Sequence, residues 1–458
     1  MTELAASRVD PTARPARVRK RIHWLAYALV VPIILYEGLL IVYPIAQGIY
    51  GSFTRIELAS KNPPVWVGWD NYRRMFNDPG FWQVIQTTLT FTALVILVAL
   101  GAGLFTALLF NRPFRPRPIA RGMMMMPWAL PEVPVVMIFI WILSPQFGVV
   151  NILARSSSRP AAPRRMADMT PSPPTTGTGS AKTNYRLREK ISQAAVYVTV
   201  AAVSLITVFP VYWMAVSTFQ PNKYTMHFPP PLYPKEINFT QFAQLFGEHP
   251  VALWLRNSFL IALITMLICT ALSVAGAYAL SSLRWKGRSF FGLFLLITQM
   301  LPEILVLIPL YIAYRKLGLL NDLPALALID GAFILPICIW ILKGVFDTVP
   351  PEVLDAAVVD GCTELSVVWK IVLPLSGPGL VAVAVVSFFF AWNEYLYASI
   401  LLGKAELMPA SVGLTTLKSI ASTPVEQYMA AGLIFSILPV LFYLTMQRYI
   451  VSGLTAGA

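Results

Sequence analysis

Long apolar runs, each about as long as a bilayer is thick, constrain this chain more than any other feature. A helix needs about 20 consecutive apolar residues to cross a hydrocarbon core roughly 30 Å thick. Because lipid offers no hydrogen-bonding partners to backbone groups, runs of this length fold as helices. The sequence therefore predicts an all-α integral membrane protein with about nine transmembrane helices, at 24–44, 86–110, 123–143, 194–216, 259–283, 290–312, 325–346, 379–402 and 428–447.

The positive charge of the chain fits a membrane protein better than a nucleic-acid-binding one. The formal net charge is +13, although only 12% of the 458 residues are charged and 57% are apolar. Basic residues cluster beside the apolar runs, as cytoplasmic loops do under the positive-inside rule. In the second group of spans they fall at 186–190, at 284–288 and at Arg448, and six spans place all three on one side. We expect that side to be cytoplasmic, and we expect no nucleic-acid partner.

Residues that carry catalysis or bind metals are sparse and scattered. The cysteines and histidines lack the spacings of metal sites and disulfide frameworks: Cys269, Cys338, Cys362, His23, His227 and His249. The segment 177–183 faintly resembles a phosphate-binding loop, but Ala181 stands where the motif requires glycine before Lys182. We therefore predict no catalytic residue, no metal site and no ATP site in this chain.

The two groups of spans share short motifs in the same order. A Pro is followed nine residues later by Phe within 43–53 and again within 209–219. A Leu-Pro-Glu triplet occupies 130–132 in the first group and 301–303 in the second. Parallel repeats are a recurrent way of building transporters around a central path. The shared order indicates a duplication of which the first copy is truncated.

The predicted organisation has three parts. Residues 1–154 form a truncated first half with three spans, 155–190 a disordered basic linker rich in Pro, Ser and Thr, and 191–458 a complete six-helix unit. Three spans from a cytoplasmic N-terminus would place the linker outside, whereas its charge favours the inside. Our hypothesis is that two reading frames have been joined and that the apolar run at 123–143 does not cross.

The most specific segment of the sequence lies at 350–374. A proline pair suits a first helical turn, and the acids Glu352 and Asp355 complement the positive end of that helix. An alanine pair then favours helix and leaves a low-relief surface, and Gly361 permits a sharp reversal. A second short helix follows and ends at the Leu-Pro pair 373–374. The pattern predicts two helices joined by a tight turn on the cytoplasmic side.

The spacing acid-Ala-Ala, three residues, Gly, nine residues, Ile-x-Leu-Pro resembles the EAA motif of permeases in binding-protein-dependent ABC importers. In that family the first short helix is a coupling helix, which docks in a groove of a cytoplasmic ATPase. Asp355 stands where Glu is usual. The resemblance implies that the following residues form the contact, its turn and the anchor of the next helix: Glu352, Asp355, Ala356, Ala357, Gly361, Leu373 and Pro374.

Further fragments extend this resemblance to the carbohydrate branch, in particular the maltose and trehalose permeases. In the second half they lie at 254–258, 308–311, 317–319, 392–395, 409–414 and 447–458. The first half resembles the partner permease type at 67–72 and 78–82, but covers only the front half of such a subunit and lacks an EAA loop. The resemblance implies a type I ABC importer permease fold for the second half, and a multi-pass protein of the bacterial inner (plasma) membrane.

The implied function is that of a permease in ATP-driven uptake of a sugar, such as a trehalose-like or maltose-like disaccharide. The chain would not be an enzyme and would carry no cofactor, since ATP and Mg are bound by a partner ATPase. The implied partners are a cytoplasmic ABC ATPase dimer, an extracytoplasmic sugar-binding (lipo)protein, a second permease subunit and membrane lipid. Two alternatives stay open: an ion-coupled secondary carrier, and a fused non-functional first half with only the second half competent. A membrane enzyme acting on lipid-linked sugars would need clustered acids or a metal motif in a loop near the membrane surface, and the sequence shows none.

Acids within apolar spans are the candidates for a substrate path, because each is costly unless it faces a partner or a wet cavity. They are Glu37, Glu132, Glu303, Asp330 and Glu394. Beside Glu394 lie Trp392 and Asn393, and an aromatic face with an amide and a carboxylate is a natural lining for a sugar. A structural hydrogen bond from Glu394 to a neighbouring helix is an equally weighted interpretation.

Overall fold

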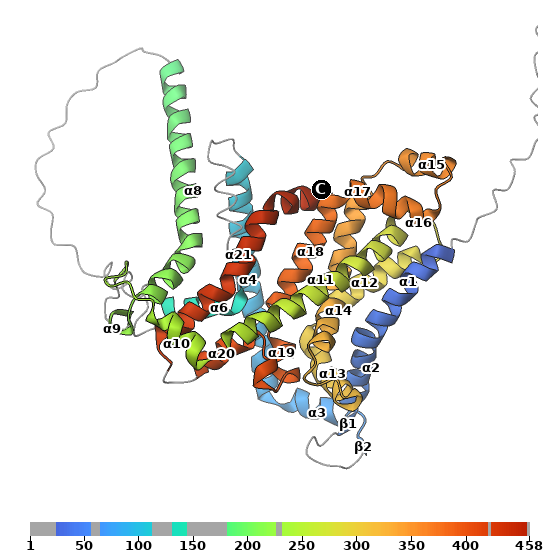
Figure 1. Cartoon of the computed structure of the whole chain (residues 1–458), viewed down its shortest axis with the longest axis horizontal. Helices are drawn as coiled ribbons and strands as arrows, with labels where there is room; N and C mark the ends of the chain where they lie inside the picture. Colours follow the sequence, from blue (N-terminus) through green and yellow to red (C-terminus); the bar gives the residue numbers. More distant parts are fainter. Residues whose placement is uncertain are drawn as a thin grey trace, which may run out of the picture.

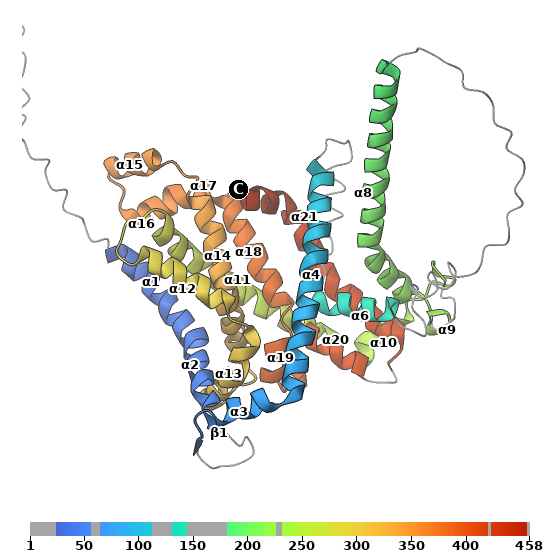
Figure 2. The same cartoon turned by 180° about the vertical axis from the view of Figure 1, so that it is seen from behind.

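The computed structural model describes residues 24–55, 65–111, 131–143, 181–225, 231–419 and 423–455, most of which are helical (Figures 1 and 2). The predicted all-α class is confirmed. The described elements of the first half are α1 (Trp24–Glu37), the π-helical turn η1 (Gly38–Val42), α2 (Tyr43–Ser52), β1 (Thr54–Arg55), β2 (Val65–Trp66), α3 (Asp70–Asn77), α4 (Pro79–Asn111) and α6 (Glu132–Ile142).

The second half contains the larger helical unit. Its elements are α8 (Ala181–Phe219), α9 (Asn222–Thr225), α10 (Thr240–Glu248), α11 (Val251–Ser281), α12 (Arg288–Met300), α13 (Glu303–Leu317), α14 (Leu323–Phe346), α15 (Pro351–Val359), α16 (Glu364–Val367), the π-helical turn η3 (Val368–Val372), α17 (Leu373–Leu375), α18 (Gly377–Trp392), α19 (Leu396–Leu401), the 3-10 turn η4 (Ala405–Leu407), α20 (Ala410–Ser419) and α21 (Val425–Thr455).

Within the described ranges, six helices are long and apolar enough to cross a membrane, or eight if each of two bent helix pairs counts as one span. The predicted third span of the first half is represented there only by α6. Its 11 residues extend about 16 Å at 1.5 Å per residue, which is too short to cross a bilayer alone. The other part of that prediction, 123–130, lies outside the described residues.

Two predicted straight spans are interrupted in the structure. The predicted span 290–312 bends by 92° between α12 and α13, because Pro302 lies between them in an extended conformation. The predicted span 379–402 ends as a helix at Trp392, and α19 starts only at Leu396. Both interruptions lie beside the cavity described below.

One end of the helical unit carries α15 together with the start of α1, the start of α8 and the end of α21 (Figures 1 and 2). We call it the α15 end. The basic connection between α11 and α12 lies there too, where the Tyr27 hydroxyl of α1 donates a hydrogen bond of 3.0 Å to the carbonyl of Lys286. Under the positive-inside rule, we expect the α15 end to face the cytoplasm.

The opposite end carries the antiparallel pair β1–β2 and the amphipathic helix α3 (Figure 1). Phe53 stacks on Trp66 with ring centroids 5.6 Å apart and meets Trp69 edge-on at 5.2 Å. The Asn71 amide ties these pieces together by donating to the carbonyls of Ser52 and Thr54. Such aromatic clusters are typical of a membrane–water interface. We call this the hairpin end.

The first half packs into the core of the second. Ile33 of α1 is fully buried, and a Cβ added at Gly276 of α11 would lie 3.0 Å from its Cδ1. The Tyr36 hydroxyl donates to the carbonyl of Leu328 in α14. Gly48 of α2 lies against Pro309 of α13. Close approach at these glycines shows that α1 and α2 are integral parts of the helical unit.

The predicted disordered linker 155–190 is wrong for residues 181–190, which form the first turns of α8. The physical reason is that the segment Arg186–Lys190 consists of good helix formers and continues without a proline into the apolar span. Residues 155–180 lie outside the described residues. The helix α4 ends, and α8 begins, at the α15 end (Figures 1 and 2).

This arrangement predicts that Ser157 of the linker faces the cytoplasm. We expect a cysteine at Ser157 to resist a membrane-impermeant maleimide in intact cells and to react once the cells are permeabilised. A cysteine at Asn77, exposed at the hairpin end, serves as the externally labelled control, and native Cys362 sets the background. Labelling of S157C in intact cells at the rate of N77C would refute a cytoplasmic linker.

Candidate functional site

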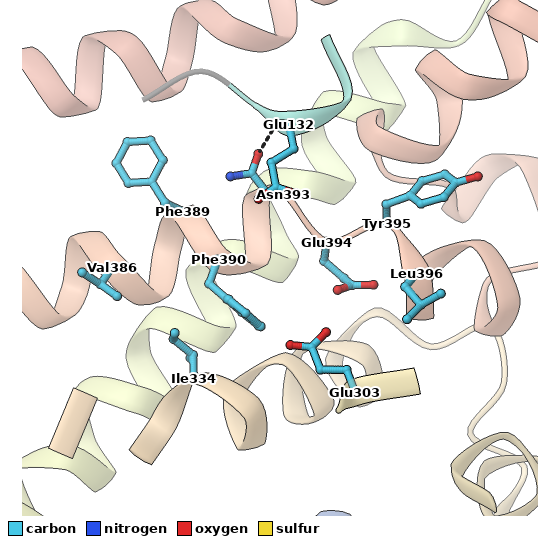
Figure 3. A pocket seen from close by; sticks show the side chains of 10 residues that line it. All are labelled: Glu132, Glu303, Ile334, Val386, Phe389, Phe390, Asn393, Glu394, Tyr395 and Leu396. Atoms are coloured by element: carbon cyan, nitrogen blue, oxygen red, sulfur yellow. Dashed lines mark hydrogen bonds between the residues drawn. The ribbon is translucent and has the colours of Figure 1, made fainter. Parts of the chain in front are cut away.

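A cavity of about 650 Å³ opens among the helices of the two halves. Its lining is drawn in Figure 3 and consists of Glu132, Glu303, Ile334, Val386, Phe389, Phe390, Asn393, Glu394, Tyr395 and Leu396. A volume of this size suits a small organic ligand, and an apolar wall with a few polar groups is the usual composition of such sites. Two of the three predicted path residues, Asn393 and Glu394, lie in this lining.

Three helix boundaries meet at this cavity. Glu132 is the first residue of α6 and Glu303 the first residue of α13, and each follows a proline. The third boundary is the segment between α18 and α19, which carries Asn393 and Glu394. The two Leu-Pro-Glu triplets of the internal repeat therefore place their acids at one site. Position in sequence pointed to a repeat but gave no sign that the two acids would meet.

Glu394 combines a structural contact with exposure to the cavity. Its side chain is 9% exposed, and Oε1 accepts backbone hydrogen bonds from Tyr397 at 2.5 Å and from Ala398 at 3.4 Å. It thereby caps the start of α19. Oε2 takes no hydrogen bond from any residue that the structure describes, and the carboxyl groups of Glu394 and Glu303 point toward one another in Figure 3. The structural interpretation of Glu394 is thus supported by these hydrogen bonds, and its role in a substrate path stays a prediction.

Asn393 connects the halves. Its Oδ1 accepts a hydrogen bond of 3.3 Å from the backbone N–H of Glu132, drawn as a dashed line in Figure 3. An N–H in the first turn of a helix has no partner within that helix, so a side-chain acceptor satisfies it. The contact fixes the start of α6 beside the α18–α19 connection.

Trp392 does not line the cavity, contrary to its predicted role as the aromatic wall of the path. It is 1% exposed and stacks between Phe388 and Phe435, with centroid distances of 5.7 and 5.0 Å. At the end of α18, residue 392 turns toward α21, while the neighbouring positions Phe389 and Phe390 reach the cavity. The aromatic lining comes from these two residues and from Tyr395, which sequence reasoning missed.

Two of the predicted membrane acids lie outside the cavity lining. Glu37 of α1 and Asp330 of α14 are 0% and 1% exposed. None of their four carboxyl oxygens has a hydrogen-bond partner within the described part of the chain. Asp330 follows Leu328 by two residues in α14, and the carbonyl of Leu328 accepts a hydrogen bond from the Tyr36 hydroxyl of α1. Their burial marks the seam between the first half and α14.

The predicted two-helix loop lies at the α15 end (Figure 1). Gly361 reverses the chain between α15 and α16 with φ +85°, a left-handed conformation that favours glycine. Thr363 caps α16, since its Oγ1 accepts from the Ser366 N–H at 3.3 Å. Helical structure then continues through η3 to Leu375, beyond the predicted end at Leu373-Pro374. The continuation is possible because Pro374 occupies the first turn of α17, where no backbone N–H is needed.

The loop presents a mixed acidic and apolar surface. Glu352, Asp355 and Ala356 are exposed, and Val359 beyond them is 87% exposed. Ala357, which the resemblance places in the contact, is only 4% exposed and packs into the chain's own core. One alanine of the pair therefore faces outward and the other anchors α15. Such a short exposed helix with apolar side chains outside the hydrocarbon core suits docking into a groove.

Comparison with known proteins identifies this architecture. Residues 268–456 match the family described as "Binding-protein-dependent transport system inner membrane component". An inner membrane ABC transporter permease protein of Escherichia coli, YcjP, is 33% identical over 272 residues, 59% of this chain and 97% of the relative. The trehalose transport system permease protein SugB of Mycobacterium tuberculosis is 36% identical over 230 residues, 50% of this chain and 84% of the relative.

Other similar proteins carry different substrate names. The diacetylchitobiose uptake system permease protein DasC of Streptomyces coelicolor is 32% identical over 261 residues, 57% of this chain and 95% of the relative. A crystal structure of a bacterial ABC transporter that imports the acidic polysaccharide alginate matches with a TM-score of 0.50 at 20% identity, covering 59% of this chain and 99% of that chain. At this identity the likeness concerns the fold.

The two contacts of Glu394 can be separated by substitution. We expect Glu394→Gln to retain the cap, because the amide oxygen still accepts from Tyr397, and so to leave the thermal midpoint unchanged. If the cavity is the predicted sugar path, the same variant exchanges a charged hydrogen bond for a neutral one, a difference of about 1.4 kcal/mol, and raises KM for uptake about tenfold.

Glu394→Ala is the matched comparison, since it removes the cap as well and should lower stability by about 1 kcal/mol. The measurements are uptake kinetics and thermal unfolding of the purified protein. Unchanged uptake in Glu394→Gln, together with a lowered midpoint in Glu394→Ala, would leave Glu394 with a purely structural role.

Proposed function

Since the chain belongs to the family of inner membrane components of binding-protein-dependent transport systems, as its 33% identity over 97% of one relative shows, we propose that it is the permease of an ATP-driven sugar importer. The chain is a multi-pass membrane protein whose second half has the type I importer permease fold. Its task would be to open the cavity to each side of the membrane in turn, without chemical change to the sugar.

The observation that carries this proposal is the α15–Gly361–α16 reversal at the basic end of the helical unit. A secondary carrier needs no exposed helix hairpin outside the membrane. A permease driven by a separate ATPase needs a surface to which that ATPase can bind. The exposed acids Glu352 and Asp355, with Ala356 and Val359, supply such a surface. The partner would be an ABC ATPase dimer, which would bind the ATP and Mg.

In the proposed mechanism, a sugar-binding protein delivers its ligand at the hairpin end. Closure of the ATPase dimer displaces α15, and the membrane helices rock between outward-facing and inward-facing states. A partner can shift this equilibrium only by as much as its contacts differ between the two states. The helix interruptions at Leu301-Pro302 and at 393–395 are the places where the wall of the cavity can bend.

The substrate class rests on the relatives. Trehalose, trehalose and maltose, maltodextrin and diacetylchitobiose occur in the names of similar permeases. The cavity agrees with a sugar of this size, since Phe389, Phe390 and Tyr395 can stack on ring faces while Asn393 and Glu394 take hydroxyl groups. A trehalose-like or maltose-like disaccharide is therefore our proposed substrate.

The domain organisation belongs to the same proposal. Residues 1–154 would be a truncated permease of the partner type, joined by a cytoplasmic linker to the complete permease of residues 191–458 and its coupling loop 350–374. A separate second permease subunit would complete the assembly. The packing of α1 and α2 into the core supports a structural role for the first half.

The coupling role of the loop predicts a specific effect of Gly361→Ala. Alanine at φ +85° costs about 1–2 kcal/mol locally and should misplace α15. Open space surrounds the position, so the spans should stay folded. We expect less sugar imported per ATP hydrolysed, measured in proteoliposomes with the copurified ATPase.

Gly318→Ala is the matched control, because Gly318 also has a positive φ, +71°, with open space around it, and ends α13 toward the hairpin end. It should carry the same local strain and leave coupling unchanged. Equal coupling in both variants, or purification of the active transporter without any ATPase, would rule out the proposed role of the loop and favour an ion-coupled carrier.

A further inference from the structure

The cavity wall has a charge pattern that the proposed function does not by itself require. Its described lining includes the carboxyl groups of Glu132, Glu303 and Glu394 and contains no Lys, Arg or His. The one amide, Asn393, uses its oxygen to accept from Glu132. The lining therefore offers several acceptors and few donors to a ligand.

Helix N-termini at the cavity offset this charge only in part. The starts of α6, α13 and α19 lie beside Glu132, Glu303 and Glu394, respectively. Each helix N-terminus is equivalent to at most about half a positive charge, whereas an ionised carboxylate contributes a full negative one. The balance is negative, so an anionic ligand would meet repulsion in a low-dielectric site where it is poorly screened.

One polar group in this wall is buried, aimed inward and left with free capacity. Glu394 is about nine-tenths buried, and only its Oε1 is occupied, by the N–H groups of Tyr397 and Ala398. The carboxyl groups of Glu394 and Glu303 face the same space in Figure 3. A ligand hydroxyl that donates there would satisfy the group, and burying it unpaired would be unfavourable.

From this geometry, and resting on the proposed function, we infer that the cavity selects sugars without negative charge. Glu132 of the first half and Glu303 of the second act as a pair of specificity-determining residues. Ring hydroxyls donate to the carboxyl groups, and Phe389, Phe390 and Tyr395 cover the apolar ring faces. Uronates, sulfonates and phosphorylated sugars are excluded by like charge. The truncated first half thus contributes directly to selectivity through Glu132.

The experiment measures the electrostatic potential of the cavity without requiring transport. Glu303→Cys is made in the full chain with Cys362→Ser, and its modification rates are compared for a cationic and an anionic methanethiosulfonate, ethyltrimethylammonium and ethylsulfonate. Buried Cys269 and Cys338 remain, and their background is subtracted with the Cys362→Ser parent. We expect the cation-to-anion rate ratio to exceed that of a free thiol at least about tenfold, because the remaining carboxyl groups of Glu132 and Glu394 attract the cation and repel the anion.

Adding Glu132→Gln to Glu303→Cys should lower this ratio several-fold, because one of the two remaining carboxylates is neutralised. Glu248→Gln, on the exposed end of α10 away from the cavity, is the matched control and should not change it. An uncharged methanethiosulfonate should react equally fast in both variants, which shows that the site has not unfolded. A ratio equal to that of a free thiol, or one unaffected by Glu132→Gln, would overturn the inference.

Ligand protection separates this inference from the proposed function. Maltose should slow modification of Glu303→Cys, whereas its uronate analogue at the same concentration should not. Equal protection by the uronate would overturn the exclusion of anions. Protection by neither sugar, with the charge ratio intact, would overturn the assignment of a sugar path and leave the role of Glu132 in the cavity potential standing.

Discussion

The need to pair every backbone N–H and C=O within lipid governs this structure more than any single contact. Inside a hydrocarbon core an unpaired backbone group is too costly to leave exposed, so a spanning helix can stop only where protein or water receives its ends. Here the interruptions at Leu301-Pro302 and at 393–395, and the start of α6, all meet at one cavity. The same interruptions that must be sheltered from lipid create the polar wall of the cavity.

The acids at these interruptions follow from the same constraint. A first-turn N–H has no partner in its own helix, and a carboxylate near that end also complements the helix dipole. Glu394 shows this directly, because one of its oxygens caps α19 and its carboxyl group also lines the cavity. A residue type chosen for capping thereby becomes available to a ligand. Capping and ligand binding are consequently not alternatives at this site.

The sequence was sufficient for those parts of the fold that depend on local pattern. Runs of apolar residues identified the long helices, and the proline, acid and glycine positions of 350–374 identified two short helices with a reversal at Gly361. Asn393 and Glu394 were found because polar groups inside an apolar span stand out. The ends of helices were less predictable: Pro374 lies inside a helical segment rather than ending it, since the π-helical turn before it changes the bonding pattern.

What the sequence could not predict depends on contacts between distant segments. Whether Trp392 faces the cavity or the core is decided by the rings of Phe388 and Phe435, which fix its orientation. The meeting of Glu132 with Asn393 joins positions 261 residues apart, and no local pattern encodes such a distance. Likewise, the inward orientation of Ala357 depends on the core beneath α15, because both alanines of the pair have the same helix propensity.

The position of the loop in the chain accounts for how force would reach the cavity in the proposed mechanism. The segment from α15 to α17 is inserted between α14 and α18, and these two helices carry Ile334, Phe389 and Phe390 of the cavity wall. Near the loop they are in close contact, since a Cβ added at Gly379 would lie 2.8 Å from Val345 Cγ2. Interiors packed this tightly have low compressibility and transmit displacement. A displacement of α15 therefore moves α14 and α18 together, and the motion is taken up where α18 ends, at the polar connection that lines the path.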